Sequence, residues 1–187
     1  MWRGFVLGII VTLVVFAGAG YAVLRTGAIP ANADAKPGGL ERYVARTSLR
    51  ATLNKEAPKT ANPVALNDAN LLAGIKLYAD HCVVCHGNAT GDRSASPIAK
   101  GEYPAPPQLG KDGVEDDPQG WTYWKIDHGI RWTGMPSWKD LLSPKEMWTL
   151  ALFLKHMDKL PPGPEAAWKQ VPSASFPAPS PRTSAAR

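Results

Sequence analysis

The longest apolar stretch of the chain is near its start, where residues 4–24 form an uncharged and mostly apolar run. Arg3 and Arg25 bracket this run, and Trp2 and Tyr21 lie near its ends, where such side chains favour the membrane interface. A helix that spans a membrane needs about 20 apolar residues, whereas the apolar core of a signal peptide has about 7–15. The pattern therefore predicts a transmembrane anchor.

A cleaved signal peptide is the alternative interpretation of residues 1–25. The segments Ala17–Ala19 and Ala31–Ala33 both resemble the small-residue sites at which signal peptides are cut. Both interpretations place everything downstream of this segment outside the cytoplasm.

Apolar positions return with helical spacing after residue 66. Asn67 can cap a helix that begins there, and the helical pattern continues to about Asp80. This first helix leads the chain directly into its two cysteines. Its apolar positions are Leu71, Leu72, Ile75 and Tyr78.

Two further helices are predicted by their start and stop signals. Asp117 as N-cap, Pro118 in the first turn and Gly129 as the stop predict a second helix. The segment Ser143–Glu146 combines a capping box with a proline in the first turn, which predicts a third helix that ends before Pro161. The apolar stripe of the third helix comprises Met147, Leu150, Ala151 and Leu154.

In the remaining segments, apolar residues do not recur with a regular spacing. Residues 26–66 are a connector in which Leu40–Glu56 can form one helix, with arginines at every fourth position. Residues 87–116 are loop-like, and residues 161–187 are rich in Pro, Ala and Ser and are expected to form a disordered or extended tail. The expected folded domain is therefore residues 67–160.

The distribution of charge excludes one class of function. The chain has a formal net charge of +5, but residues 67–160 contain 10 Lys and Arg against 12 Asp and Glu. The basic excess lies in the flanking segments. A nucleic-acid-binding protein carries its basic stripe on the folded module, so no nucleic-acid partner is expected.

Both cysteines of the chain belong to the sequence Cys82-Val83-Val84-Cys85-His86. Cys-x-x-Cys-His is the attachment signature of a c-type haem. On a helical turn the three chemical groups project from one face, so two thiols can meet the two vinyl groups and the imidazole can meet the iron. A zinc site needs four ligands, and a thioredoxin-like dithiol does not use the histidine. The motif therefore predicts one covalent haem c.

The second iron ligand decides the chemistry, because an open iron binds small molecules whereas an iron with two protein ligands transfers electrons. His81 directly precedes Cys82 and cannot reach the opposite haem face. The candidates on the third helix are less suitable, since Met147 lies on its apolar stripe. These candidates are His156, Met147 and Met157.

Met135 and His128 remain as candidates for the distal ligand. Met135 lies in a turn where Gly134 allows a close approach of the backbone and Pro136 restricts the chain just after the thioether. His128 lies at the end of the second helix and is expected to be exposed or to cap that helix. We therefore predict Met135 as the distal ligand and keep His128 as the alternative.

Residues 67–160 resemble a class I monohaem cytochrome c of the small bacterial type with His/Met ligation. The haem motif, the Pro-x-Leu segment at Pro107, the Met-Pro turn and the aromatic residues of the last helix occur in the order of that family. The positions that carry the resemblance are Gly74, Tyr78, Cys82, Cys85, His86, Pro107, Leu109, Ile126, Gly129, Gly134, Met135, Pro136, Trp138, Trp148 and Phe153.

The resemblance implies an all-α fold, the small cytochrome c fold, with three main helices and loops wrapped around a covalent haem. The N-terminal transmembrane helix would precede this fold. The resemblance also implies that His86 is the proximal and Met135 the distal iron ligand. In the family, the carbonyl of the proline at Pro107 accepts a hydrogen bond from the proximal imidazole.

By the same resemblance, the expected function is electron transfer in a bacterial respiratory chain, with no substrate and no catalytic residue. The expected partners are redox proteins and membrane lipid, and the haem domain is expected to face the periplasm. A haem subunit of a larger membrane oxidoreductase is the main alternative. A haem-based gas sensor is a third hypothesis, and it requires an open iron.

Overall fold

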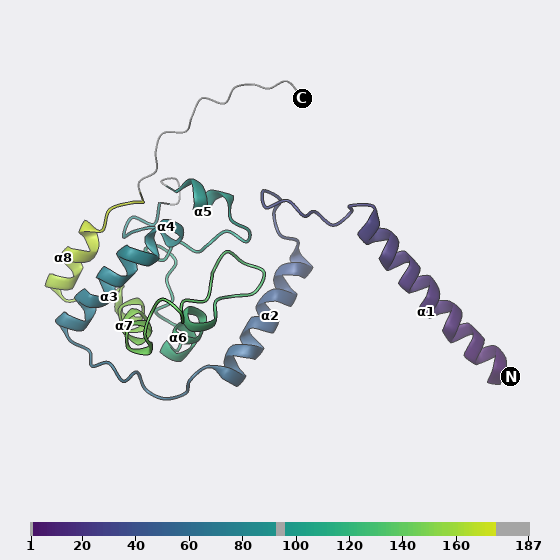
Figure 1. The fold of residues 1–187 in the computed structure, drawn as a ribbon, viewed down its shortest axis with the longest axis horizontal. Coiled ribbons are helices and arrows are strands. Elements are labelled where there is room, and N and C mark those ends of the chain that lie inside the picture. The colour runs from purple at the N-terminus through teal and green to yellow at the C-terminus, as the bar shows by residue number, and fades with distance from the viewer. Residues whose placement is uncertain (1, 93–95, 175–187) are drawn as a thin grey trace, which may run out of the picture. The chain divides into compact units, whose positions relative to one another are not determined.

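The computed structural model describes residues 2–92 and 96–174, and within these ranges it contains eight α-helices and no β-strand (Figure 1). The chain divides into two compact units, Met1–Lys36 and Pro37–Arg187. The all-α class that the sequence predicts is confirmed.

The first unit is built on one helix, α1 (Trp2–Arg25), with every side chain exposed. Its mean hydropathy is 2.4. Its 24 residues extend over about 36 Å, which exceeds the roughly 30 Å hydrocarbon core of a bilayer. The helix is therefore long and apolar enough to cross a membrane, and a signal sequence would share these properties.

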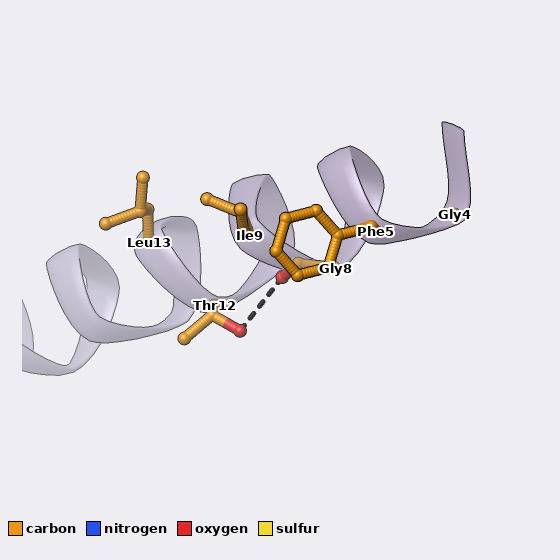
Figure 2. A pocket seen from close by; sticks show the side chains of 6 residues that line it. All are labelled: Gly4, Phe5, Gly8, Ile9, Thr12 and Leu13. Carbon is orange, nitrogen blue, oxygen red and sulfur yellow. Dashed lines mark hydrogen bonds between the residues drawn. The ribbon is translucent and has the colours of Figure 1, made fainter. Parts of the chain in front are cut away.

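One side of α1 forms a shallow groove whose lining belongs to this helix alone (Figure 2). The Thr12 hydroxyl donates a hydrogen bond of 2.9 Å to the Gly8 carbonyl within the groove. This bond satisfies the hydroxyl inside the helix, so a threonine is tolerated in an apolar span. The lining residues are Gly4, Phe5, Gly8, Ile9, Thr12 and Leu13.

The second unit contains the three main helices expected from the sequence, α3 (Asp68–His81), α6 (Gln119–His128) and α7 (Pro144–His156). The predicted caps of two of them are confirmed. The Asn67 side chain accepts a hydrogen bond from the amide of Asn70 at the start of α3. The Ser143–Glu146 capping box is present at the start of α7.

The predicted N-cap of α6 is wrong by one residue. Pro118 occupies the N-cap position, and no side chain caps this helix. The Asp117 carboxylate instead pairs with Lys125 at 2.7 Å, and both side chains are partly buried. The carboxylate thus has a partner eight residues along the chain, and a capping pattern, which considers only the first turn, does not show such a pairing.

The core lies where α3 crosses α7. A Cβ atom at Gly74 would lie 2.6 Å from Phe153 Cβ, so the close approach of the two helices requires glycine. Tyr78 and Phe153 are fully buried next to the crossing, with ring centroids 5.7 Å apart in an edge-to-face arrangement. The cysteine motif that follows α3 packs against this core.

The connector contributes α2 (Gly39–Glu56), close to the predicted helix Leu40–Glu56. Its C-terminal end packs against α6. Leu53, Ala57 and Val64 are buried, so the last part of the connector belongs to the folded unit.

The segment 161–187, expected to be a disordered or extended tail, contains a helix, and the expectation is wrong for its first part. Helix α8 (Pro162–Gln170) packs against α3, and the buried Trp168 contacts the rings of both Tyr78 and Phe153. The composition misleads because three of the prolines lie at the N-cap and in the first turn, where proline is compatible with a helix. Residues 175–187 lie outside the described part of the chain.

Two short helices complete the fold, α4 (Val83–His86) and α5 (Pro97–Gly101). The rest of the described segment between residues 87 and 118 has no regular structure, as the sequence predicts.

Candidate haem site

The cysteine motif forms a single helical turn. Cys82 ends α3, and its carbonyl accepts hydrogen bonds from the amides of Cys85 at 3.2 Å and His86 at 2.9 Å. The three residues therefore occupy positions i, i+3 and i+4 of one turn, which is the spacing that brings side chains to a common face. All three side chains are partly buried.

The His86 imidazole is oriented by the segment around Pro107. Its Nδ1 atom lies 2.9 Å from the Pro107 carbonyl oxygen. A carbonyl only accepts hydrogen bonds, so Nδ1 carries a proton and Nε2 presents its lone pair. Burial lowers the pKa of His86, while its hydrogen bond to Pro107 and the charge of Glu102 raise it. The balance favours the neutral imidazole, which is the form that binds a metal.

Two more hydrogen bonds tie the Pro107 segment to the motif. The Leu109 amide donates to the His86 carbonyl at 3.1 Å, and the Gln108 side chain donates to the Cys85 carbonyl at 2.9 Å. Gly87 directly follows the motif and has φ 71° and ψ 178°. This region of backbone conformations is accessible essentially to glycine alone.

Both thiols are held in the protonated form. Burial raises the pKa of Cys82 to about 12. Burial and the hydrogen bond to Glu102 raise the pKa of Cys85 to about 11. Catalytic and redox-active cysteines have lowered pKa values, so the shifts of these two thiols run in the opposite direction.

Met135 lies in a turn that is closed by hydrogen bonds. The Ile130 amide donates to the Met135 carbonyl at 3.1 Å, and the Met135 amide donates to the Thr133 hydroxyl at 3.0 Å. The Met135 side chain is partly buried and packs against the hydrophobic core. The turn thus holds the thioether toward the interior.

Glu102 connects this turn with the cysteine motif. Its carboxylate accepts a hydrogen bond from Cys85 Sγ at 3.3 Å. The same carboxylate lies against Gly134, where a Cβ atom would be 2.8 Å from Glu102 Cδ. The structure therefore brings the Met135 turn and the motif together although about 50 residues separate them. Sequence reasoning missed Glu102, because a single acidic residue in an aperiodic loop carries no signal.

The other ligand candidates have different environments. His128 is exposed, its ring stacks on Trp124 at 4.5 Å, and its Nδ1 lies 3.3 Å from a carboxylate oxygen of Asp127. The His81 ring lies 5.5 Å from that of Trp138. Three candidates lie in or just after α7, with both methionines buried in the core; these are Met147, His156 and Met157.

The tryptophans near the site divide into two groups. Trp138 packs against the core, and Trp121 and Trp124 are partly buried on α6. Trp132 is 87% exposed and has φ 64°, a conformation that is strained for a large side chain.

The residues present fit a haem better than a bare metal ion. Within the described ranges, no group of three or more His, Cys, Asp and Glu side chains is arranged to hold a metal. A haem iron takes four of its ligands from the porphyrin, so two protein ligands such as one imidazole and one thioether would complete its coordination. The two neutral thiols on one turn with the imidazole are the groups that covalent attachment uses.

The comparison with protein families agrees with this chemistry. Residues 69–154 match the family model described as cytochrome C oxidase, cbb3-type, subunit III. The class of the folded unit is therefore shown: it contains a class I monohaem cytochrome c domain, and its cofactor is haem c. Electron transfer with redox proteins is the function of this class.

The other comparisons add no further identification. No curated protein matches this chain. A chain of the Kuenenia stuttgartiensis reducing HAO-like protein complex is 23% identical, with a TM-score of 0.41, over 55% of this chain and 52% of that chain. The chain thus spans about half the length of that protein, and so distant a likeness carries no argument about function.

Proposed function

We propose that this protein is a membrane-anchored electron carrier of a bacterial respiratory chain, which moves one electron at a time between a reductase and an oxidase. The observation that supports it best is the helical turn Cys82–His86 with its imidazole held by the Pro107 carbonyl. This arrangement brings two thiols and the Nε2 lone pair to the same face of one helical turn, as a covalently attached haem needs.

The haem supplies the Fe(II)/Fe(III) couple, and each protein residue has a distinct role around it. Cys82 and Cys85 form the two thioether bonds. His86 is the proximal iron ligand, and Pro107 sets the orientation and the tautomer of its ring. Met135 is the distal ligand, and its soft thioether favours ferrous iron and raises the reduction potential.

The proposed location is the bacterial inner membrane, with α1 as a single span and the haem domain in the periplasm. The length and hydropathy of α1 support this location. If the leader is cleaved, the same domain is secreted to the periplasm. In both cases the protein binds redox partners and no small-molecule substrate, and it acts as a carrier rather than as an enzyme.

A second candidate function is that of a haem subunit in a larger membrane oxidoreductase. The description of the matching family model, which names a subunit of an oxidase, favours it. Extraction in mild detergent separates the two functions. A lone carrier elutes as a single polypeptide, whereas a subunit elutes with partners in fixed ratio.

Extraction of the purified protein with acidified acetone tests the proposed haem attachment. The red colour is expected to stay with the precipitated polypeptide, and intact-mass analysis should show the mass of one haem and report any missing N-terminal residues. A protein in which Cys82 and Cys85 are both replaced by Ser is the control and should release its pigment. Release of the pigment from the unchanged protein would overturn the proposal.

A further inference from the structure

Glu102 directly follows a short helix that is fixed to the cysteine motif. Helix α5 packs against α4, which carries most of the motif (Figure 1). Ser96 caps α5 and donates a hydrogen bond from its hydroxyl to the Val84 carbonyl, and Ala99 inside α5 is fully buried. The Glu102 amide donates to the Ile98 carbonyl at 3.1 Å. The packing of α5 therefore sets the position of Glu102 relative to the motif.

The Glu102 carboxylate adjoins both of the segments that carry proposed iron ligands. It accepts a hydrogen bond from Cys85 Sγ at 3.3 Å, and Cys85 directly precedes His86. It also lies against Gly134, which directly precedes Met135, because a Cβ atom on Gly134 would be 2.8 Å from Glu102 Oε1. A haem bound by His86 and Met135 occupies the space between these two segments, so the carboxylate lies at its edge.

The negative charge of Glu102 is not neutralised by a neighbouring cation. The ion pairs within the described residues all involve other carboxylates. The side chain is partly buried, so water screens its charge less than at a fully exposed position. The charge acts on the ligand side of the motif, where it raises the pKa of the His86 imidazole. The field of this carboxylate therefore reaches the place of the iron.

A negative charge at the haem edge favours ferric iron. Oxidation adds one positive charge to the iron, and a nearby carboxylate stabilises that added charge. Covalent attachment replaces the thiol hydrogen of Cys85 by a carbon, so Glu102 loses this hydrogen-bond donor and keeps its negative charge. The effect of Glu102 is therefore opposite to that of a thioether ligand at Met135, which favours ferrous iron.

We infer that Glu102 sets the reduction potential of this protein, because its carboxylate at the haem edge lowers the potential that the His86 and Met135 ligands would otherwise give. The inference rests on the haem site of the proposed function. Glu102 is not an iron ligand, and its role is electrostatic. A lower potential makes the reduced protein a stronger electron donor to its acceptor.

A purely structural role of Glu102 is the alternative, in which its side chain only holds the Met135 turn against the motif. Two substitutions separate charge from shape. Glutamine has nearly the size of glutamate and can keep the contact with Gly134, but it carries no charge. Aspartate keeps the charge on a side chain that is one methylene shorter, so it reaches less far towards Gly134.

The test measures the reduction potential of the full-length, haem-loaded protein by potentiometry. Glu102→Gln should shift the reduction equilibrium towards ferrous iron by about tenfold, which is about 59 mV for one electron. A unit charge about 10 Å away has an effect of this order when the effective dielectric constant is about 20. Glu102→Asp should stay within about threefold of the unchanged protein, and Glu102→Lys should shift the equilibrium by about 100-fold.

Glu165→Gln is the matched control, because it makes the same change on α8. The Glu165 carboxylate is exposed and pairs with Lys169 at 2.6 Å, so its removal should leave the reduction potential unchanged. The far-red thioether–iron absorption band is recorded for every variant. An intact band shows that the Met135 ligand is retained and that a changed potential reports the charge.

Three results would overturn the inference. One is an unchanged or lower potential in Glu102→Gln. Another is a shift in Glu102→Asp as large as that in Glu102→Gln, which would assign the effect to shape. The third is loss of the thioether–iron band in Glu102→Gln, which would assign Glu102 to the support of the Met135 turn.

The charge series keeps the test decisive and separates it from the proposed function. If Glu102→Gln does not retain its haem, Glu102→Asp and Glu102→Lys still differ by two charges, and equal potentials of these two variants would overturn the inference. An unchanged protein without covalent haem would reject the proposed function itself. Covalent haem with a potential that does not respond to Glu102 would reject only the electrostatic role and leave the electron carrier intact.

Discussion

His86 is held in place by the backbone of a distant segment rather than by the four-residue helix that carries it. Pro107 accepts the hydrogen bond of its ring, and the Leu109 amide binds its carbonyl. A short helix alone is too weakly stabilised to fix a side chain. The orientation of the imidazole therefore depends on the 107–109 segment, 21 residues away in the sequence.

Replacement of Met135 by Ala is expected to lower the reduction potential and to open the iron to external ligands, while the haem stays attached. The shift should be on the order of 0.1 V, within the roughly 0.8 V over which axial ligands tune haem. Potentiometry and the far-red thioether–iron absorption band measure the two effects. His128→Ala is the control and should leave the spectrum intact. Loss of the low-spin spectrum in His128→Ala, with Met135→Ala unchanged, would make His128 the ligand.

Carbon monoxide binding to the reduced protein distinguishes electron transfer from gas sensing. The unchanged protein should bind it slowly or not at all at neutral pH if, as proposed, the Met135 thioether is the distal ligand. Met135→Ala should bind it rapidly. Rapid binding to the unchanged protein would favour the gas sensor.

Gly87→Ala is expected to destabilise the protein by about 1–3 kcal/mol, because an alanine is strained at φ 71° and ψ 178°. Its Cβ atom would also lie 2.6 Å from Gln108 Oε1. Denaturant unfolding measures the change. Gly101→Ala is the matched control, since a Cβ atom at Gly101 meets nothing within 4 Å and the position is helical. Equal stability of the two variants would show that the Gly87 backbone is not constrained.

Helix α8 is the element that most enlarges the core beyond the expected domain. Trp168 is 6% exposed and contacts the rings of Tyr78 and Phe153, at 5.2 Å between centroids in each case. After the helix, the Asn88 side chain donates to the Val171 carbonyl at 2.9 Å. The segment that follows the haem motif is thus tied to the C-terminal extension.

Trp168→Ala should lower the free energy of unfolding by about 3–5 kcal/mol, as expected for the loss of a buried tryptophan. Trp132→Ala is the control for the same change of residue, because the Trp132 side chain is 87% exposed and should contribute little. Chemical denaturation monitored through the haem absorbance would measure both. A small effect of Trp168→Ala would mean that α8 does not stabilise the fold.

The whole molecule combines a membrane-length helix with a haem domain, joined by the basic connector. An uncleaved α1 buries its apolar surface only in a bilayer, since none of its residues is buried in the protein. The anchored protein should therefore stay with membranes during a high-salt wash and dissolve only with detergent. Release by salt alone, together with a mass that lacks the first residues, would show that the leader is cleaved and that the attachment is electrostatic.

The local features of this protein could be predicted from its sequence. Helix α3 follows from apolar periodicity and helices α6 and α7 from their start and stop signals. The caps at Asn67 and Ser143 depend on side chains within three residues of the backbone that they bind. The motif Cys82–His86 is also local, because one helical turn is enough to align its groups. Interactions of this kind act between near neighbours, so the sequence pattern contains them.

Only the tertiary structure decided the features that depend on contacts between distant residues. Helix α8 has nine residues and is too short to be stable alone, so it depends on the burial of Trp168 against Tyr78 of α3 and Phe153 of α7. Asp117 pairs with Lys125 instead of capping α6, and Glu102 joins the Cys85 thiol to the Met135 turn. The sequence by itself determined the helices and the haem chemistry through local spacing, whereas long-range packing determined which polar and aromatic side chains complete the site.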